Sequence, residues 1–233
     1  MELIDYKNKH SGETCFIIGS GPSIKNQDLS SIVDYYSFCS NWFPVHHEFH
    51  KLKIDYYCAY DNKFVSPTVN EKWYRIIKDI NCKFFFPKQW NKISFGLKKL
   101  FYVNYRPRKK IYNNNKFSYD IFKGFYNGDT VIINFCIPLA FFMGFDKIIL
   151  LGCECDYGIE KDNNFDNAYF HSAKSHETMN EHSKHSASIW QQNVLRSYEV
   201  INTYANQIGK KIVNATNGGR LNIFPRKKLS EII

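Results

Sequence analysis

The chain alternates between short, wholly apolar runs and longer amphipathic segments, with polar turns between them. Strands that are buried on both faces of a parallel sheet have continuous apolar runs, because helices cover each face. The pattern therefore predicts an α/β fold, in which a parallel sheet carries helices on both faces. Strands are predicted at residues 15–18, 36–39, 54–60, 83–86, 147–151 and 211–214. Helices are predicted at residues 28–33, 73–79, 130–143 and 189–208.

Two stretches interrupt this alternation. Residues 87–125 are basic and aromatic without a clear period, and residues 158–188 are polar and rich in histidine. The second stretch has too few apolar residues for a core, so we expect a lid loop over a site. The first is interpreted either as an insertion that faces a substrate or as an irregular part of the domain. The length of 233 residues fits a single domain, 1–233.

A turn of small residues follows the first predicted strand: Gly19, Ser20, Gly21, Pro22 and Ser23. Small residues let a phosphate approach the backbone, and a helix that starts at Pro22 would point free N–H groups at an anion. The turn lacks both the lysine of a Walker loop and the third glycine of the dinucleotide motif. It therefore indicates either a phosphate site or an ordinary strand-to-helix turn.

Polar residues also follow other predicted strands. Asn41 follows the second strand, Asp61 and Asn62 follow the third, and Glu154 follows the strand at 147–151. Because the carboxyl ends of parallel strands meet at one edge of a sheet, we expect these residues to share a rim with the small-residue turn. Taken singly, each is also typical of ordinary turns.

The chain has a net charge of +9, and its basic residues cluster at 106–110 and 226–228. This charge raises the question of which anionic partner the chain binds. No DNA or RNA recognition motif accompanies these clusters, so nucleic acid is not a predicted partner. An anionic nucleotide-linked substrate and an anionic membrane surface are both natural alternatives, and two solvated loops are the third. The longest apolar stretch, 131–145, is too short to span a bilayer. We expect a cytoplasmic protein, with contact to the inner face of the membrane and a homo-oligomer both left open.

The seven cysteines are odd in number and lie mostly within apolar runs, which predicts reduced thiols and no disulfide framework. Cys153 and Cys155 have the wrong spacing for a usual zinc site, so no metal is predicted there.

In their order along the chain, these motifs resemble two related families. One is the bacterial CMP-sialic-acid-dependent sialyltransferases that decorate lipooligosaccharide, and the other is the Maf-type domains linked to flagellin glycosylation. The sialyltransferase-like motifs are Gly19 to Ser23, Cys39 to Asn41, Tyr60 to Asn62, Met143 to Gly152, and Asp156-Tyr157. The Maf-like motifs are Asn127 to Val131 and Asn214 to Arg226.

The resemblance implies a Rossmann-like, inverting glycosyltransferase that acts in the synthesis of cell-surface glycans such as lipopolysaccharide or capsule. Its donor would be a CMP-activated acidic sugar (sialic acid, a related nonulosonate or Kdo), and its acceptor a saccharide or glycolipid hydroxyl. No metal or other cofactor is implied, because CMP leaves with a single phosphate. Ser20 stands where the sialyltransferases commonly have asparagine, which leaves the sugar open.

The same resemblance assigns roles to individual residues. The turn from Gly19 to Gly21 would face the phosphate, while Asn41 and Asp61 or Asn62 would approach the ribose, cytosine or sugar. The residues that would close over the nucleotide are Asn127, Gly128, Asp129 and Thr130. Tyr157 matches a tyrosine that contacts the leaving phosphate, and Tyr169 is a looser candidate for a second one.

An inverting transfer needs a base to take the proton of the acceptor hydroxyl, and histidine suits this because its pKa lies near neutrality. The related sialyltransferases carry a His-Ser step before the last long helix, and three such steps occur here. Position favours His185 as the base and then His182, with His171 as a candidate for acceptor binding. A separate cluster, His46 to His50, is interpreted as surface or acceptor-side residues.

Two other functions are consistent with the same residues. Maf-type domains also resemble an archaeal pterin-diphosphokinase family, in which ATP and Mg²⁺ would need paired carboxylates; Glu154 and Asp156 are the pair available here. A non-catalytic nucleotide-binding or membrane-peripheral scaffold is the second alternative. The response to CMP, ATP and Mg²⁺ separates these three functions.

Overall fold

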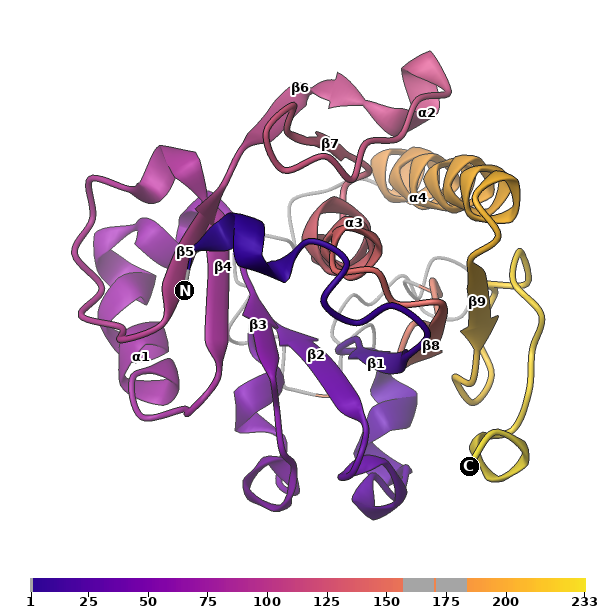
Figure 1. Cartoon of the computed structure of the whole chain (residues 1–233), viewed down its shortest axis with the longest axis horizontal. Coiled ribbons are helices and arrows are strands. Elements are labelled where there is room, and N and C mark those ends of the chain that lie inside the picture. Colours follow the sequence, from indigo (N-terminus) through magenta and orange to yellow (C-terminus); the bar gives the residue numbers. More distant parts are fainter. Residues whose placement is uncertain (1, 157–169, 171–183) are drawn as a thin grey trace.

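The computed structural model describes residues 2–156, 170 and 184–233, with the backbone alone for residues 68 and 184–187 (Figure 1). Within this part of the chain, seven strands form one sheet in the order β5-β4-β3-β2-β1-β8-β9, and every neighbouring pair is parallel. The predicted α/β class with a parallel sheet is confirmed. The strands are β1 (Thr14–Ile18), β2 (Tyr36–Ser40), β3 (Tyr56–Cys58), β4 (Lys83–Pro87), β5 (Leu100–Val103), β8 (Lys147–Leu151) and β9 (Lys211–Asn214).

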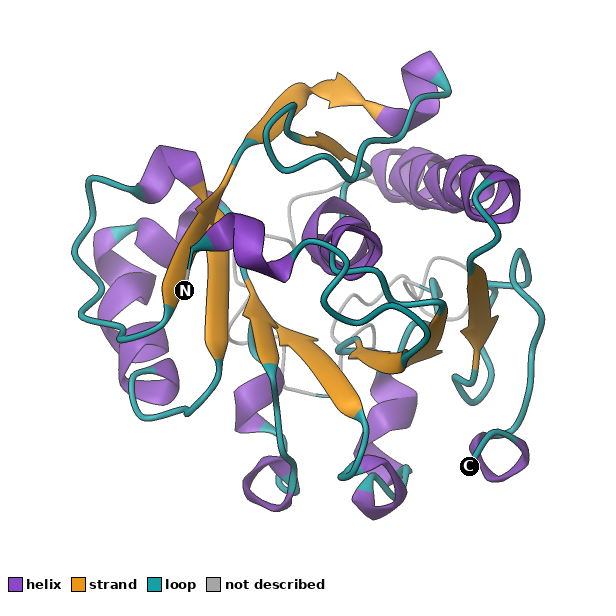
Figure 2. Ribbon diagram, viewed as in Figure 1, coloured by secondary structure: helices purple, strands orange, loops and turns teal. Residues whose placement is uncertain are grey.

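Helices cover both faces of this sheet, as Figure 2 shows for the purple helices above and below the band of strands. Alternate residues of each strand enter different cores: Cys15 and Ile17 pack with α3 (Ile137–Phe142) and α4 (Lys184–Gln207). Phe16 and Ile18 enter the core that contains Trp73 and Ile77 of α1 (Pro67–Ile77). The strands are apolar at every position because each side chain is buried by helices on its own face.

The strand order reverses between β1 and β8. The chain begins the sheet at β1, adds β2 to β5 on one side, and then returns to place β8 and β9 on the other side of β1. Open α/β sheets bind their ligands at such a switch point, outside the carboxyl ends of the strands. The loops that leave β1 and β8 are therefore the first place to look for a site.

Several predicted boundaries were wrong. The helix expected at residues 28–33 is only a 3₁₀ turn, Ser30–Ile32, because so short a segment cannot offset the cost of helix nucleation. Helix α1 begins six residues before the expected start, at Pro67, whose fixed φ suits a first helical position. Helix α4 begins at Lys184, so residues 184–188 belong to it and not to the expected lid loop.

The apolar helix predicted at 130–143 is present, but its first half has more residues per turn than an α-helix. Residues Ile132–Cys136 form a π-helix, which continues directly into α3. Pro138 lies just beyond the wide turn and has no N–H to donate, which weakens regular α-helical bonding there. π-helical turns are frequent at functional sites, which makes the polar residue of this one, Asn134, a candidate for a functional role.

The irregular stretch at 87–125 holds more secondary structure than its pattern indicated. Leu100–Val103 extends the main sheet as the edge strand β5. A second, two-stranded parallel sheet pairs β6 (Tyr105–Lys110) with β7 (Phe125–Asn127), and α2 (Ile111–Asn114) follows β6. All seven cysteines are buried and free of disulfides. In the described residues, no helix combines the length and the apolar character needed to cross a membrane.

Candidate functional site

The loops that follow the parallel strands leave the sheet at its carboxyl edge. Gly19–Ser23 follows β1, Asn41 follows β2, and residues 153–156 follow β8. Since β2, β1 and β8 are adjacent, the structure brings these three loops together at the switch point.

The turn after β1 is bonded directly to the loop after β8. The N–H of Gly21 donates to the carbonyl of Gly152 at 2.9 Å, and the N–H of Ser23 donates to Oε1 of Glu154 at 2.6 Å. The Glu154 carboxylate lies so close to Gly21 that a Cβ there would overlap it. Glycine is therefore required at position 21 by close approach, and the two loops behave as one unit.

These hydrogen bonds reduce the number of N–H donors that the turn has free for an anion. The helix expected from Pro22 is a 3₁₀ segment of five residues, Pro22–Asn26, too short for an appreciable helix dipole. The N–H groups of Gly19, Gly21 and Ser23 already donate to acceptors of the chain itself, whereas that of Ser20 has no acceptor among the described residues. A phosphate would thus find fewer free donors than the sequence indicated, because the Glu154 carboxylate takes one of them.

Glu154 connects three loops. Its side chain holds the turn after β1, and its carbonyl accepts hydrogen bonds from the N–H groups of Arg220 (2.6 Å) and Leu221 (3.2 Å) in the loop after β9. The residue is 6% exposed, and burial raises the pKa of its carboxyl against the opposing effect of the Ser23 hydrogen bonds. Asp156 instead lies 3.9 Å from the Arg220 guanidinium. The two carboxylates thus have different partners, and the described residues contain no group of three or more metal-ligating side chains.

Unpartnered polar atoms concentrate at the same edge. In the described part of the chain, six buried side-chain polar atoms have no hydrogen-bond partner, and five of them lie in the segments after β1, β2 and β8. These five belong to Ser23, Gln27, Asn41, Trp42 and Glu154; the side chains of Ser23 and Glu154 also interact with each other, so Gln27, Asn41 and Trp42 are the clearest cases. Buried polar groups in proteins are nearly always hydrogen-bonded, so such a concentration indicates a place that contacts a polar ligand.

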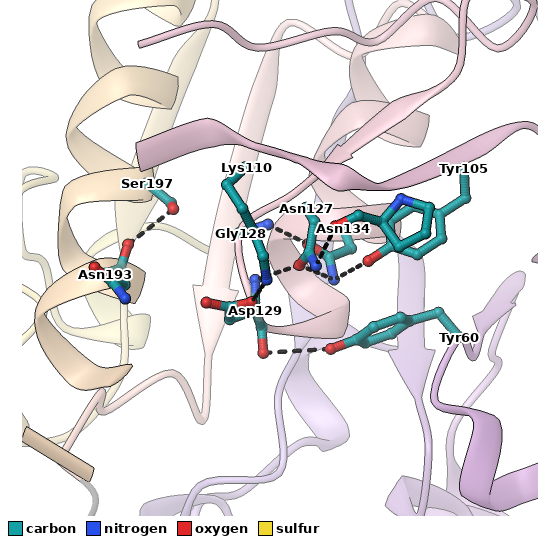
Figure 3. A network of polar contacts seen from close by, with 10 residues as sticks. Tyr60, Tyr105, Lys110, Asn127, Gly128, Asp129, Asn134, Asn193 and Ser197 are labelled. Carbon is teal, nitrogen blue, oxygen red and sulfur yellow. Dashed lines mark hydrogen bonds and ion pairs between the residues drawn. The ribbon is translucent and has the colours of Figure 1, made fainter. Parts of the chain in front are cut away.

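The turn Asn127–Thr130 is held by an asparagine inside the π-helix (Figure 3). The side chain of Asn134 accepts from the N–H of Gly128 at 2.6 Å and donates to the hydroxyl of Tyr105 at 3.3 Å. Asn127 in turn accepts from the N–H of Asp129 at 2.8 Å. Asn134 has no exposed surface, so its hydrogen bonds form in a water-excluded core. Sequence analysis missed Asn134; its signal was one amide in an otherwise apolar run.

Side chains from several elements place this turn near the carboxyl end of β3. The hydroxyl of Tyr60 donates to the carbonyl of Asp129 at 3.3 Å, while the Asp129 carboxylate pairs with Lys110 of β6. Thr130 hydrogen-bonds to the hydroxyl of Tyr198 on α4. The turn therefore connects the main sheet, the small sheet and α4.

Asp61 and Asn62 have local structural roles. Oδ1 of Asp61 accepts from the N–H of Lys63 at 3.0 Å and so caps a short 3₁₀ turn, Asn62–Val65. Oδ1 of Asn62 accepts from the indole N–H of Trp90 at 3.1 Å. The Asp61 contact is ordinary turn chemistry, whereas the Asn62 contact joins two distant segments; a role for either residue toward the nucleotide or sugar stays a prediction.

The candidate histidines fall into three groups. His46 is 4% exposed, and its Nε2 donates to the carbonyl of Ile24 at 3.0 Å, so the surface position that was one alternative for it was wrong. Burial lowers the pKa of His46, which fits a neutral, structural imidazole. His47 and His50 are exposed. His185 belongs to the first turn of α4, but its side chain lies outside the described residues, as do Tyr157, Tyr169, His171 and His182.

Between residues 157 and 183, the structure describes Phe170. The N–H of Phe170 donates to the carbonyl of Ser20 at 3.0 Å, and its ring lies 5.1 Å from that of His46 and 6.0 Å from that of Phe43. Phe170 thus packs directly against the loops after β1 and β2.

No protein-family model matches the chain, and no curated protein matches it. Among solved structures, the MAf glycosyltransferase from Magnetospirillum magneticum AMB-1 is similar, with a TM-score of 0.54 and 15% sequence identity. The match covers 99% of this chain and 38% of that one, so this chain spans well under half the length of that protein. At this identity the likeness shows the fold alone. This likeness supports the Maf-type resemblance as far as the fold is concerned. The sialyltransferase resemblance rests on sequence motifs. The chain has a Rossmann-like α/β fold shared with part of a MAf glycosyltransferase.

Proposed function

We propose that this chain is a glycosyltransferase that moves an acidic sugar from a CMP-activated donor to a saccharide hydroxyl in cell-surface glycan synthesis. The observation that carries the proposal is the concentration of unpartnered buried polar atoms at the switch point. Each such atom costs about 1–3 kcal/mol when it stays unpaired, a cost that hydrogen bonds to a nucleotide would offset. The fold shared with part of a MAf glycosyltransferase supports sugar transfer as the reaction class.

The turn after β1 favours a nucleotide with one phosphate at the leaving group. Its amide donors at Gly21 and Ser23 are occupied by the chain itself, which suits a monophosphate better than a diphosphate. Asn41, whose buried Oδ1 lacks a partner, would contact the nucleoside or sugar.

In this mechanism the acceptor hydroxyl attacks the anomeric carbon of the donor while the bond from that carbon to the phosphate oxygen breaks. The imidazole of His185 takes the proton of the hydroxyl, with His182 and His171 as the alternatives. Tyr157 and Tyr169 donate hydrogen bonds to the departing phosphate. CMP leaves with the bonding electron pair, and the configuration at the anomeric carbon inverts.

Nucleotide binding tests the proposal directly. We expect CMP, without added metal, to raise the melting temperature by several degrees, and UDP, GDP and ATP to do less. Ligand at about 100 times its dissociation constant adds about 2.7 kcal/mol of stability. Asn41→Gly keeps the left-handed backbone (φ 50°) and should shrink the CMP shift. Asn115→Gly is the matched control, because Asn115 has a similar φ of 47° at the exposed end of α2.

Other responses would contradict the proposal. Stabilisation by ATP with Mg²⁺ alone would favour the pyrophosphokinase, and no shift with any nucleotide would favour the scaffold.

A second experiment tests the base. His185→Ala should lower the rate of transfer from a CMP-activated sugar by about 10²–10⁴-fold, the range that general-base catalysis contributes. The thermal shift with CMP should be unchanged, because the base contacts the acceptor and not the nucleotide. Full activity in this variant would move the role to His182 or His171, or away from histidine.

A further inference from the structure

The small sheet carries a strongly basic surface. We call residues 104–127, which include β6, α2 and β7, the basic ribbon; it forms the upper rim of the molecule in Figure 1. Six lysines and arginines and one acid, Asp120, lie within it, so this tenth of the chain supplies +5 of the net charge of +9. A charge density of this kind on one edge points to an anionic partner.

An irregularity in β6 turns its basic residues outward. Arg106 lies opposite Tyr126 and Lys110 lies opposite Asn127, so β6 has three residues, 107–109, for which β7 has none. Arg106, Arg108 and Lys109 are exposed, and no carboxylate of the described residues pairs with them. Lys110, by contrast, points inward to Asp129.

An exposed aromatic side chain lies beside these charges. Phe122 is 63% exposed, more than the other exposed large apolar residues of the described chain. Oδ1 of Asp120 accepts from the N–H groups of Phe122 (2.8 Å) and Lys123 (3.0 Å), which fixes the backbone turn that carries this ring. Arg106 packs over the neighbouring Gly124, where a Cβ would lie 3.2 Å from its Cγ. The ribbon therefore combines an aromatic ring with adjacent cations.

The other basic cluster of the chain is arranged differently. The guanidinium of Arg226 donates to the carbonyls of Thr216 (2.7 Å), Gly218 (2.5 Å) and Leu221 (3.1 Å), where it holds the loop after β9. The guanidinium of Arg226 thus stabilises the loop after β9. Within the part of the chain that the structure describes, Arg106 and Arg108 of the ribbon form no ion pair, whereas Arg226 is bonded to three carbonyls.

We propose that the basic ribbon docks this domain on an anionic phospholipid bilayer, with Phe122 inserted among the headgroups. Basic side chains near an anionic leaflet each strengthen partitioning about fivefold, and aromatic rings favour the membrane–water interface. A bilayer fits better than a nucleic acid, because Phe122 protrudes singly and the ribbon carries no stacking platform. The proposal goes beyond the proposed function and does not depend on it.

Sedimentation with phospholipid vesicles tests the docking surface. The full chain should bind vesicles that contain phosphatidylglycerol and not vesicles of phosphatidylcholine alone. Arg106→Gln/Arg108→Gln/Lys109→Gln should lower partitioning about 100-fold, the product of three fivefold effects. Phe122→Ser should also lower it, without any change of charge. Lys25→Gln/Lys53→Gln/Lys92→Gln removes the same charge from three exposed lysines outside the ribbon and should have little effect.

Three outcomes would overturn the proposal. Equal losses in the two triple variants would show that net charge alone drives binding. Binding of a single-stranded RNA oligonucleotide that depends on the ribbon, without vesicle binding, would identify a nucleic-acid surface.

The third outcome concerns protection of a strand edge, because charged residues and prolines such as Pro107 also keep exposed edges from aggregating. If that is their whole role, the ribbon variant will aggregate without lipid, and Phe122→Ser will partition like the unaltered chain.

Discussion

Gly21→Ala is expected to lower the free energy of unfolding by about 2–4 kcal/mol, because the new methyl group overlaps the buried Glu154 carboxylate. The carboxylate must then move and release the N–H of Ser23. Urea denaturation measures the change. Gly209→Ala is the control without overlap: nothing lies within 4 Å of the added Cβ, and its cost comes from the φ of 70°, whereas Gly21 has a φ of −67° that alanine adopts readily. We expect about 1 kcal/mol there.

A double-mutant cycle separates the overlap from other effects of the alanine. Glu154→Ala alone leaves the Ser23 N–H unpaired, yet it also removes the group that alanine at position 21 would meet. The loss in the free energy of unfolding of the double variant should therefore be smaller than the sum of the two single losses, by at least about 1 kcal/mol. Additive losses would contradict the contact.

Glu154→Gln completes this series, because its amide oxygen can still accept from Ser23. Burial raises the pKa of Glu154, so its contribution to stability is full at acid pH and falls as pH rises through the raised pKa. Glutamine should remove that fall and leave a flatter profile of stability against pH.

Asn134→Ala is the second change with a large expected effect. It removes the acceptor of the Gly128 N–H inside the core and the donor to Tyr105, and should cost about 2–4 kcal/mol. Asn202→Ala is a matched control, because Asn202 also lies in a helix but makes one longer hydrogen bond, 3.4 Å to the carbonyl of Ile223. We expect less than about 1 kcal/mol for it.

Two measurements on the Asn134 variant are informative. Urea denaturation gives the loss of stability, and hydrogen exchange of the Gly128 amide reports whether the turn opens. A loss under about 1 kcal/mol with a protected amide would contradict the role of Asn134 in holding this turn.

The sheet was predictable because its inner strands have apolar residues on both faces. β1 and β8 show this most clearly, and their bounds follow from the apolar runs alone. β5 was missed because it lies at the edge, where three of its four residues are only half-buried and the apolar signal is weak. The turn at 30–32 was overestimated because its polar–apolar pattern resembles that of a longer helix.

The candidate site was predictable only in part. Parallel topology was enough to bring the Gly19 turn and Asn41 to one edge of the sheet. It could not show that Glu154 occupies the Ser23 amide, since that contact depends on two residues 131 positions apart. The interpretation of His46 failed for a similar reason: burial by Phe43 and Phe170 arises from packing and has no period in the sequence.

The central place of β1 has a consequence for how the chain is made. Ile17 pairs with Phe38 on one side and with Leu150 on the other, so a nascent chain that has emerged only as far as β5 leaves one flank of β1 open. Such a partial sheet exposes backbone donors and acceptors to other chains. During synthesis this flank therefore stays open to pairing with other chains until β8 has left the ribosome.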